Sequence, residues 1–478
     1  MLQGLLQWGT QGTKPIAILT GSAGTGKTTL LKAVVDALQE SAVHFILLAP
    51  TGRAARILAS KTGYPARTIH SLLYRPKDAD PIEVAGSDQR TELVGFTLNF
   101  SCIPAVVHRT VFIVDEASMV SDERNQSDSM SFGYGTLLGD LFRYAGIDNS
   151  VSNGSRVLFV GDPFQLPPVR QFRSSSADAD KSPALSDEYI TERYGFEVLT
   201  YALTTIHRQS ENSPILENAK RVREWLDRGD VSTFFLIDDN VTITKIDKNE
   251  AIDSASQNTT ADSIIITKSN SEALSYNQAI RDKRFNGSNL PIQAGDILLI
   301  CRNLAKSDFF NGDLLEVISA DSEHECHSVV LPTTGEVINL TYRNIEVRPL
   351  EIIEAEVKQC KILENALNSV VTSIGEDEAK AIQIDFSRRH QELRVGSSQF
   401  MSKLLEDPYY NALVVKYGYA ITCHKAQGGE WDKVTVHFEQ AGRNVDFFKW
   451  AYTAITRSQR FLNLVNTPFL RTPVDMPP

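Results

Sequence analysis

The chain has 478 residues, of which 42% are hydrophobic and 22% charged, so it is long enough for two to four domains with ordinary cores. Its formal net charge of −11 is the wrong sign for a protein that coats nucleic acid, although a local groove can still grip one strand. No run approaches the roughly 18 apolar residues of a membrane span, and no basic segment followed by an apolar one opens the chain. We therefore expect a cytoplasmic enzyme without a membrane partner.

Four segments in the first part of the chain share one pattern, in which a short apolar run ends in a polar turn. They are "IAILTG" (16–21), "FILLAP" (45–50), "VFIVDE" (111–116) and "RVLFVGD" (156–162). Strands that are apolar on both faces and alternate with helical segments are typical of a parallel sheet covered on both sides. The polar turns then meet at one edge of that sheet, where open α/β folds bind ligands.

The same pattern resumes after a segment rich in Ser, Asp and Ala at residues 171–195, which predicts a loop. A second parallel sheet is predicted from segments 196–209, 261–281, 417–431, 433–438 and 451–465. It is interrupted at about residues 311–411, where short alternating strands indicate a small antiparallel barrel followed by helices. A smaller insertion at residues 74–108 contains a candidate β-hairpin.

Five scattered cysteines show no C-x-x-C spacing, which argues against a disulfide framework and for reduced, mostly buried thiols. They are Cys102, Cys301, Cys326, Cys360 and Cys423. The sequence "HECH" at residues 324–327 lacks a second pair of ligands for a tetrahedral zinc site, so a polar turn is the better interpretation.

The sequence "GSAGTGKT" at residues 21–28 fits the phosphate-binding loop G-x-x-x-x-G-K-[ST] and stands between a predicted strand and a predicted helix. Its glycines allow backbone N–H groups to surround phosphates at the positive end of a helix dipole. We expect Lys27 to reach the β and γ phosphates of ATP and Thr28 to hold Mg²⁺. The predicted nucleotide-binding residues of this loop are Gly21, Ala23, Gly24, Thr25, Gly26, Lys27, Thr28 and Thr29.

Two further strand ends supply polar groups suited to hydrolysis. Asp115 is expected to bind the Mg²⁺ shell and Glu116 to orient and deprotonate a water molecule. This pair favours an ATPase over a kinase, because a kinase needs a pocket for a second hydroxyl. Gln165, in "GDPFQLPPV" at residues 161–169, is a candidate sensor of the γ phosphate or of the attacking water; the alternative is an ordinary turn residue.

Ten motifs in chain order, among them "GSAGTGKT", "APTGRAA", "VDEASM", "GDPFQLPPV", "TCHKAQGGEW" and "YTAITR", resemble those of superfamily 1 DNA helicases over most of the chain. They are most similar to the 5′-to-3′ branch, the RecD-like and Dda-like proteins. The resemblance implies an α/β fold of two RecA-like, parallel-sheet phosphate-loop NTPase domains with a hairpin insertion and a small Src-homology-3-like barrel insertion. The implied parts are residues 1–73 and 109–190 (first RecA-like domain), 74–108 (hairpin), 191–310 and 412–478 (second RecA-like domain), and 311–411 (barrel with a helical part).

The resemblance also assigns residues to two ligands. Arg208 and Arg457 match the two arginines that contact the γ phosphate in this family, and Glu430 matches the residue that touches the ribose. The residues that match contacts to the DNA backbone are Pro50, Thr51, Arg53, Thr68, His70, Thr422, His424 and Lys425. Such contacts grip phosphates without reading sequence, as a motor requires.

The two insertions offer further candidates. In related enzymes the hairpin separates strands, and here Phe96 and Phe100 are candidates to stack on bases. Residues 96, 98 and 100 also alternate along one face of a predicted strand, however, and such an apolar face is more often core. In the second insertion Phe386, Arg388 and Arg389 are candidate contacts, although a solvated helix face is the commoner arrangement.

One departure from the family concerns adenine. The family usually has a glutamine that recognises adenine in a helix well before the phosphate loop, whereas only twenty residues precede Gly21 here, so that helix is predicted to be truncated. Gln3 and Gln7 are available but poorly placed. We expect either a start farther upstream or relaxed selection of the base.

Together these features predict a Mg-ATP-dependent translocase on single-stranded DNA that unwinds duplexes with single-stranded overhangs in the 5′-to-3′ direction, a polarity that rests on the resemblance alone. A monomer is expected, with a protein partner in repair or recombination. One alternative is a DNA-stimulated ATPase that binds or remodels nucleic acid without unwinding it. The other is a phosphate-loop kinase or small-molecule ATPase, which would not need Arg457.

Overall fold

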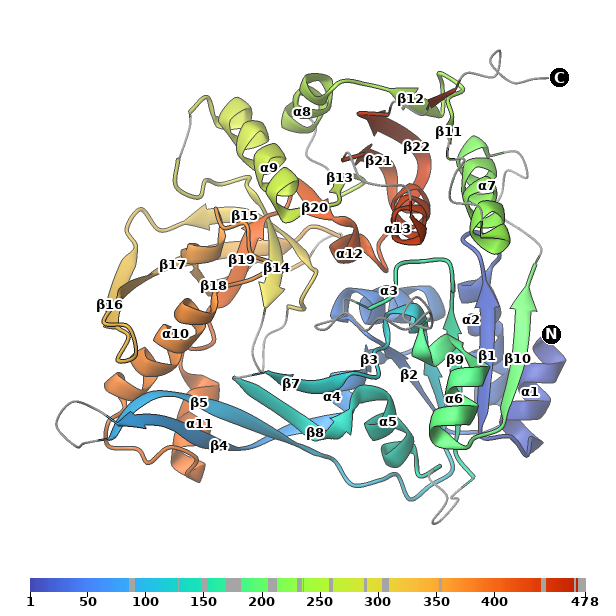
Figure 1. Ribbon diagram of the computed structural model, residues 1–478, viewed down its shortest axis with the longest axis horizontal. Helices are drawn as coiled ribbons and strands as arrows, with labels where there is room; N and C mark the ends of the chain where they lie inside the picture. The colour runs from blue at the N-terminus through green and yellow to red at the C-terminus, as the bar shows by residue number, and fades with distance from the viewer. Residues whose placement is uncertain are drawn as a thin grey trace.

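The computed structural model describes residues 1–85, 91–127, 129–147, 154–168, 182–204, 213–229, 234, 236–257, 261–287, 290–302, 309–351, 355–439, 444–467 and 470–471. These residues form two large parallel sheets, one two-stranded parallel sheet, one barrel-like sheet and one four-stranded hairpin sheet. Figure 1 shows the two parallel-sheet domains one above the other, with the barrel-like sheet and its helices to one side.

The first domain is built on a six-stranded sheet in which every neighbouring pair is parallel. In sheet order the strands are β10 (Val198–Leu203), β1 (Ile16–Gly21), β9 (Arg156–Gly161), β6 (Val111–Val114), β2 (Phe45–Ala49) and β3 (Ala66–Thr68). One face is covered by α1 (Leu2–Gln11), α2 (Lys27–Glu40) and α3 (Gly52–Thr62), and the other by α4 (Ile69–Leu73), α5 (Leu137–Ala145) and α6 (Asp187–Tyr194). Residues of β1 alternate between the two cores, because successive side chains of a strand point to opposite faces.

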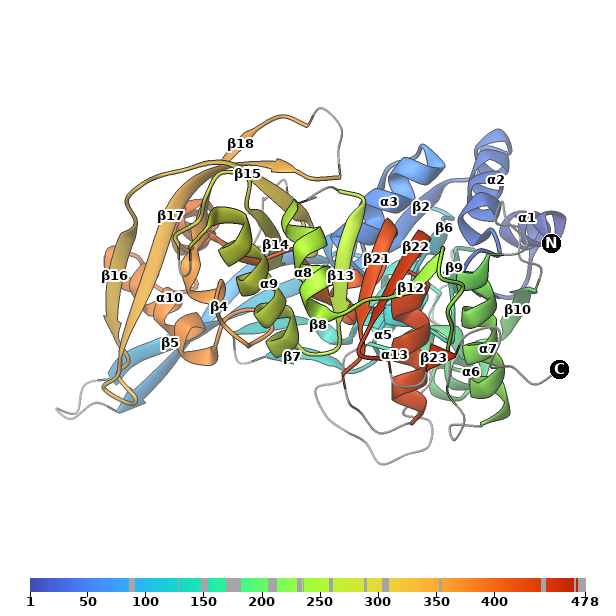
Figure 2. The ribbon, with the colours of Figure 1, turned by 90° about the horizontal axis from the view of Figure 1, so that it is seen from above.

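The second domain contains a five-stranded sheet that is also parallel throughout. In sheet order the strands are β12 (Ile243–Lys245), β22 (Ser458–Val465), β21 (Trp431–His437), β13 (Ser263–Thr267) and β20 (Ala420–Thr422). Its helices are α7 (Pro214–Arg228), α8 (Lys248–Gln257), α9 (Asn270–Phe285), α12 (Cys423–Ala426) and α13 (Val445–Ile455). A further parallel pair joins β11 (Leu236–Ile237) to β23 (Leu470–Arg471). The predicted fold of two RecA-like parallel-sheet domains is confirmed, and Figure 2, seen from above, shows the second domain lying over the first.

Strand β10 belongs to the first sheet, although the sequence placed residues 191–310 in the second domain. It pairs in parallel with β1, from Ile16 opposite Val198 to Gly21 opposite Leu203. An apolar strand fits either parallel sheet equally well, so its sequence pattern does not decide which one it joins. The chain therefore passes from the first domain to the second after β10.

The barrel-like sheet is larger than the insertion predicted at residues 311–411. In sheet order its strands are β15 (Leu314–Ala320), β14 (Ile297–Arg302), β19 (Leu413–Tyr417), β18 (Lys358–Leu363), β17 (Val337–Pro349) and β16 (Glu325–Val330), and a further pairing of β15 with β17 closes the ring. Helices α10 (Glu376–Arg389) and α11 (Ser398–Glu406) follow β18. Strands β14 and β19 lie outside the predicted insertion, and the likeness to a Src-homology-3 barrel remains a prediction.

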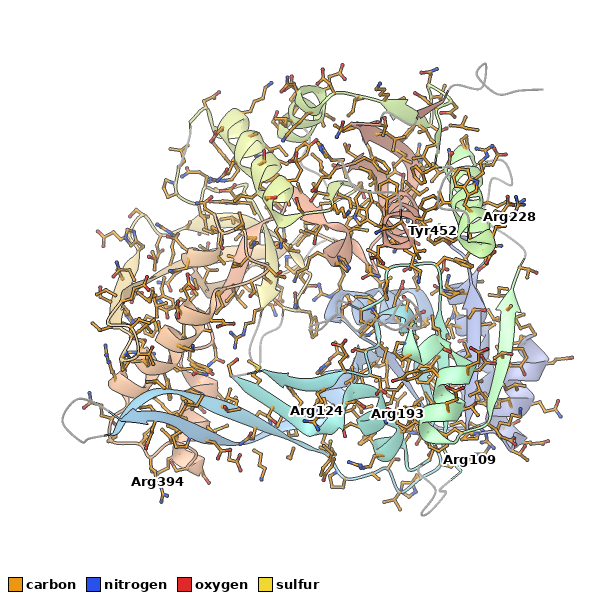
Figure 3. The ribbon with its side chains drawn as sticks, viewed as in Figure 1. Arg109, Arg124, Arg193, Arg228, Arg394 and Tyr452 are labelled. Atoms are coloured by element: carbon orange, nitrogen blue, oxygen red, sulfur yellow. The ribbon has the colours of Figure 1, made fainter. Side chains whose placement is uncertain are left out.

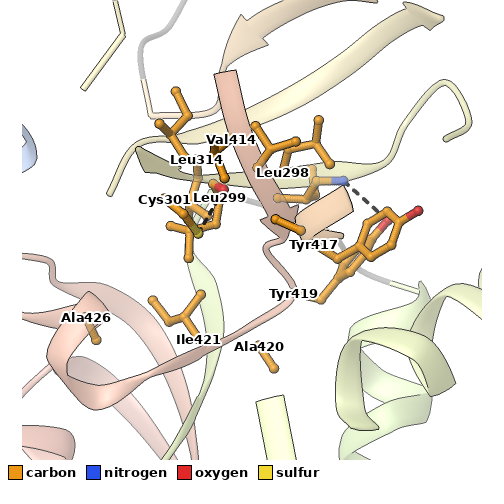
Figure 4. Packing of buried hydrophobic residues seen from close by; sticks show 14 of the residues in the cluster. Leu298, Leu299, Cys301, Leu314, Val414, Tyr417, Tyr419, Ala420, Ile421 and Ala426 are labelled. Atoms are coloured by element: carbon orange, nitrogen blue, oxygen red, sulfur yellow. Dashed lines mark hydrogen bonds between the residues drawn. The ribbon is translucent and has the colours of Figure 1, made fainter. Parts of the chain in front are cut away.

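One continuous hydrophobic core joins the barrel to the second domain. Figure 4 shows Leu298, Leu314 and Val414 of the barrel grouped together, with Ile421 of β20 below them, and all four belong to this core. Because the shared core buries side chains from both units, the barrel is attached rigidly to the second domain rather than tethered by a linker.

The predicted hairpin consists of β4 (Tyr74–Ala85) and β5 (Thr91–Cys102), paired antiparallel. A second hairpin that the sequence analysis did not predict, β7 (Arg124–Ser127) and β8 (Met130–Thr136), extends the same sheet through a parallel pairing of β5 with β8. Figure 1 shows β4 and β5 reaching from the first domain to α10 and α11. There the Gln383 side chain donates to the Phe96 carbonyl (2.8 Å) and accepts from its N–H (3.0 Å).

Candidate nucleotide site and DNA interface

A cavity of about 740 Å³ lies between the two parallel-sheet domains. Its first-domain lining includes Ala23, Gly24, Thr25, Gly26, Lys27, Thr28, Thr29, Asp115, Glu116 and Gln165. The second domain contributes Gly428, Glu430 and Arg457. Residues that are more than four hundred positions apart in the chain thus face one space, as the sequence analysis expected for a shared nucleotide site.

The phosphate loop has the backbone shape that its sequence predicts. Gly26 has φ of +79° immediately before α2 begins at Lys27, a conformation that glycine adopts at little cost. The loop therefore presents the N-terminus of α2 to the cavity, where the helix dipole favours anions. The Lys27 ammonium donates to the carbonyls of Gly21 (2.7 Å) and Ser22 (3.1 Å) and so stays within the loop.

Two adjacent carboxylates face the loop from the end of β6. Removal from water, reinforced by the neighbouring Glu116 carboxylate, raises the pKa of Asp115 to about 7, while Lys27 acts in the opposite direction. Together with the Thr28 hydroxyl in the same cavity, Asp115 offers the hard oxygen donors that Mg²⁺ prefers, so these residues fit the ion.

Gln165 and Arg457 complete the cavity from opposite domains. The Gln165 side chain is buried, and its Oε1 accepts no hydrogen bond from the residues that the structure describes. The Arg457 guanidinium is also buried and donates to the carbonyls of Thr453 (3.1 Å) and Gly429 (3.2 Å). The other predicted γ-phosphate arginine, Arg208, lies outside the described residues.

Glu430 lies at the cavity edge, where its carboxylate is 3.4 Å from the Lys61 ammonium of the first domain. Lys61 was not predicted from the sequence, and neither was Met1, which also lines the cavity. Helical spacing offered a signal for Lys61, because Ala54, Ile57, Leu58 and Lys61 of α3 all line the cavity and repeat every three or four residues.

A ten-residue helix, α1, precedes the phosphate loop, at the position of the helix that was expected to be truncated. Its Leu5 and Trp8 are buried in the core that also contains α2. Neither Gln3 nor Gln7 is among the residues that line the cavity, and both side chains are exposed. Recognition of adenine by either one stays a prediction.

The segment 422–430 faces two different spaces. Gly428 and Glu430 line the nucleotide cavity, whereas Thr422 and Lys425 line a small separate pocket of about 20 Å³ on the barrel side. Lys425 also donates to Asn311 (3.0 Å). Burial lowers the pKa of His424 from its ordinary value.

The predicted DNA contacts of the first domain have structural partners of their own. Thr51 and Thr68 each accept a hydrogen bond from the backbone at the start of a helix, Thr51 from Ala54 N–H (3.2 Å) and Thr68 from Ser71 N–H (3.1 Å). Pro50, just before Thr51, is half-buried. The His70 ring lies 5.7 Å from the Phe132 ring of the unpredicted hairpin.

Arg53 lies in the interior, 2% exposed, rather than on a surface that a phosphate reaches. Its guanidinium pairs with Glu351 from the end of the barrel and sits 4.2 Å from the Trp431 ring of the second domain. Arg53 therefore joins three parts of the molecule, and the predicted DNA contact has no support from its position.

The candidate DNA contacts in the two insertions are mostly packed against other residues of the protein. Phe96 is 0% exposed and its ring lies 5.3 Å from Phe400, so the alternative of a core residue holds for it. Phe100 is half-buried and stacks on Phe132 at 4.5 Å. Phe386 is buried in the same core as Phe400.

Charged groups of the barrel are likewise occupied by protein partners. Arg389 pairs with Asp385 and Asp407, and Arg388 donates to a backbone carbonyl. His327 of the "HECH" sequence lies 3.1 Å from Asp385.

Among the described residues no group of three or more His, Cys, Asp or Glu is arranged to hold a metal ion, and no helix is long and apolar enough to cross a bilayer. All five cysteines have free thiols.

Comparison with known proteins agrees with the two-domain cavity. Residues 6–127 match the AAA domain family, and residues 417–465 match the UvrD-like helicase C-terminal domain family. The ATP-dependent RecD2 DNA helicase of Deinococcus radiodurans is 26% identical over 455 residues, which cover 93% of this chain and 46% of the relative. The RecBCD enzyme subunit RecD of Buchnera aphidicola subsp. Schizaphis graminum is 21% identical over 497 residues, covering 96% and 71% of the two chains.

The chain thus contains an AAA domain and a UvrD-like helicase C-terminal domain, and its sequence is similar to RecD-type helicases over more than nine-tenths of its length. The chain spans about half the length of the Deinococcus relative. The ATP-dependent DNA helicase dda of Enterobacteria phage T4 is 48% identical over 56 residues, 12% of this chain and 13% of the relative. Among solved structures, a Pif1 helicase from Bacteroides in complex with ADP-AlF3 and ssDNA has a TM-score of 0.46 and 17% identity, covering 100% of this chain and 92% of that one.

Proposed function

We propose that the protein is a Mg-ATP-dependent translocase on single-stranded DNA and a DNA helicase of 5′-to-3′ polarity. The observation that carries the proposal is the cavity in which Arg457 and Glu430 of the second domain face Lys27 and Asp115 of the first. A phosphate-loop enzyme that works within one domain has no need of an arginine from a distant one. Polarity rests on the resemblance of the motifs alone, and DNA preference on that resemblance and on relatives named as DNA helicases.

Each cavity residue has a role that its chemistry permits. Lys27 and Arg457 place positive charge on the γ phosphate, where charge develops during transfer. Glu116 orients and deprotonates the attacking water. Gln165 senses that water or the γ phosphate, because its Oε1 accepts no hydrogen bond from the described residues. Mg²⁺, held by Thr28 and Asp115, would neutralise charge on the phosphate oxygens when bound. Glu430 is placed to meet the ribose.

Coupling to DNA follows from the segment that contains Thr422, Lys425 and Glu430. Its two ends line two separate spaces, so a nucleotide-dependent shift of the second domain also moves groups on the barrel side. Lys425, Thr422 and His424 are the proposed contacts to the DNA backbone, together with Pro50, Thr51, Thr68 and His70 of the first domain. We expect the monomer to be active.

The test is ATP hydrolysis with and without single-stranded DNA, in the wild-type protein and in the variants Lys27→Ala, Arg457→Ala and Arg457→Lys. We expect DNA to stimulate hydrolysis, and both Arg457 variants to lose roughly 10³-fold or more, as when an arginine that contacts the γ phosphate is removed. The Lys variant keeps the charge but not the planar fork, so it separates loss of geometry from loss of charge. Hydrolysis that ignores DNA or survives in both Arg457 variants would contradict the proposal.

Polarity needs a second measurement. Strand displacement from duplexes with a 5′ overhang, and not from duplexes with a 3′ overhang, is the expected result. Displacement from 3′ overhangs alone would place the chain in the other polarity branch. DNA-stimulated hydrolysis without displacement on either substrate would instead identify a DNA-remodelling ATPase.

A further inference from the structure

The α13 helix of the second domain inserts one tyrosine hydroxyl into the first domain. Tyr452 lies where α13 meets the first domain, as Figure 3 shows, and is 1% exposed. Its hydroxyl donates to the Asp162 carboxylate (2.6 Å) and accepts from the Ala23 N–H of the phosphate loop (3.2 Å). One side chain of the second domain thus binds two strand-end loops of the first.

Asp162 opens the loop that presents Gln165 to the nucleotide cavity. It is 0% exposed, and its second oxygen accepts from the Phe164 N–H (3.1 Å). A buried carboxylate is costly unless hydrogen-bonded, so the Tyr452 hydroxyl is a partner that Asp162 needs. Burial, and to a smaller extent the Asp162 carboxylate, raises the pKa of Tyr452 well above its ordinary range. The phenol therefore keeps the proton that it donates.

The same loop is held at its other end by two more residues of the second domain. Thr453, next to Tyr452, accepts from the Leu166 N–H (2.9 Å), and Gln427 donates to the Leu166 carbonyl (2.8 Å). The Arg457 guanidinium in turn donates to the Thr453 carbonyl (3.1 Å). Hydrogen bonds therefore run from the phosphate loop through α13 to both the Gln165 loop and Arg457.

We propose that Tyr452 is a positioning residue that sets the Gln165 loop against the phosphate loop whenever α13 is docked, so that Gln165 and Arg457 reach the nucleotide together. The inference rests on the proposed function for its effect on hydrolysis. Tyr452 does not line the cavity, so it acts through Asp162 and Ala23 rather than by touching ATP. Its removal should therefore affect turnover more than nucleotide binding.

The variants are Tyr452→Phe, Asp162→Asn and their combination. The matched control is Tyr342→Phe, because Tyr342 is equally buried in the barrel and its hydroxyl has no hydrogen-bond partner among the described residues. We expect Tyr452→Phe to lower kcat for ATP roughly 10-fold to 100-fold, the range in which misplacement of a catalytic group falls, with KM changed less than about twofold. Because the two groups act as a unit, the combination should lose little more than either single variant.

A second readout does not depend on hydrolysis. Amide hydrogen exchange in residues 156–168 should be faster in Tyr452→Phe than in the wild type and unchanged in Tyr342→Phe, since the loop loses one of its attachments. Equal kcat in Tyr452→Phe and Tyr342→Phe, or unchanged exchange in residues 156–168, would overturn the inference. If the wild-type protein itself shows no DNA-stimulated hydrolysis, the proposed function fails, and the exchange measurement alone decides whether Tyr452 holds the loop.

Discussion

Lys61 of the first domain and Glu430 of the second form an ion pair of 3.4 Å at the edge of the nucleotide cavity. Their side chains are 44% and 32% exposed, so water screens the pair. The contact therefore adds little to stability, and its importance lies in its position. Lys61 brings a positive charge to a cavity whose proposed ligand is a polyanion.

Lys61→Ala should change the free energy of unfolding by less than about 1 kcal/mol, as for other exposed ion pairs. The KM for ATP should rise while kcat changes little, because the lost charge attracts bound nucleotide in the ground and transition states alike. Steady-state kinetics and urea unfolding measure the two effects. Lys32→Ala is the control, since its pair with Asp36 is similarly exposed but Lys32 does not line the cavity. An unchanged KM in Lys61→Ala would refute the expectation.

Arg53→Ala should, by contrast, lower the free energy of unfolding substantially. The substitution removes the partner of the half-buried Glu351 and the buried cation above the Trp431 ring, and losing a largely buried ion pair costs up to about 3 kcal/mol. Arg460→Ala breaks a pair with Asp432 that is 68% and 34% exposed and should cost less than about 1 kcal/mol. Urea unfolding of both variants provides the comparison, and equal losses would show that the junction does not depend on Arg53.

The nucleotide half of the site was predictable because it is local in sequence. The loop from Gly21 to Thr28 and the pair Asp115 and Glu116 each follow one strand, and parallel strands bring their ends to one edge. Arg457 and Glu430 were located only through the family resemblance. No local pattern shows that a second sheet turns its own strand ends toward the first.

The parts that sequence reasoning missed depend on pairing and burial. The pattern of β10 does not say which sheet it joins, and the β14 and β19 strands are apolar enough for a parallel sheet or a barrel. Arg53 stands in a motif that suggested DNA contact, yet the fold surrounds it with Glu351 and Trp431. The role of Tyr452 is visible only when the α13 helix is placed against the Asp162 loop.

Gln383→Ala should loosen the hairpin. The variant removes both hydrogen bonds to the Phe96 backbone and leaves a buried N–H and carbonyl unpaired, which costs about 1–3 kcal/mol for each group. Exchange at residues 93–98 should therefore become faster. Gln359→Ala is the control, because that amide donates to Glu346 at an exposed position. If residues 93–98 keep their protection, the hairpin is held by packing of Phe96 rather than by Gln383.

His424 should make stability depend on pH. Burial lowers its pKa in the folded protein, so below the ordinary value of about 6.5 the unfolded chain binds the extra proton more readily than the folded one. The stability that neutral His424 contributes is thus complete above that pH and is lost as the pH falls through 6.5 toward the folded value. His424→Gln, which cannot take up the proton, should lose less stability than the wild type between pH 7.5 and pH 5.5. Urea unfolding at both pH values measures the difference, and an identical loss in the two proteins would show that another group, such as His437 with its similarly lowered pKa, is responsible.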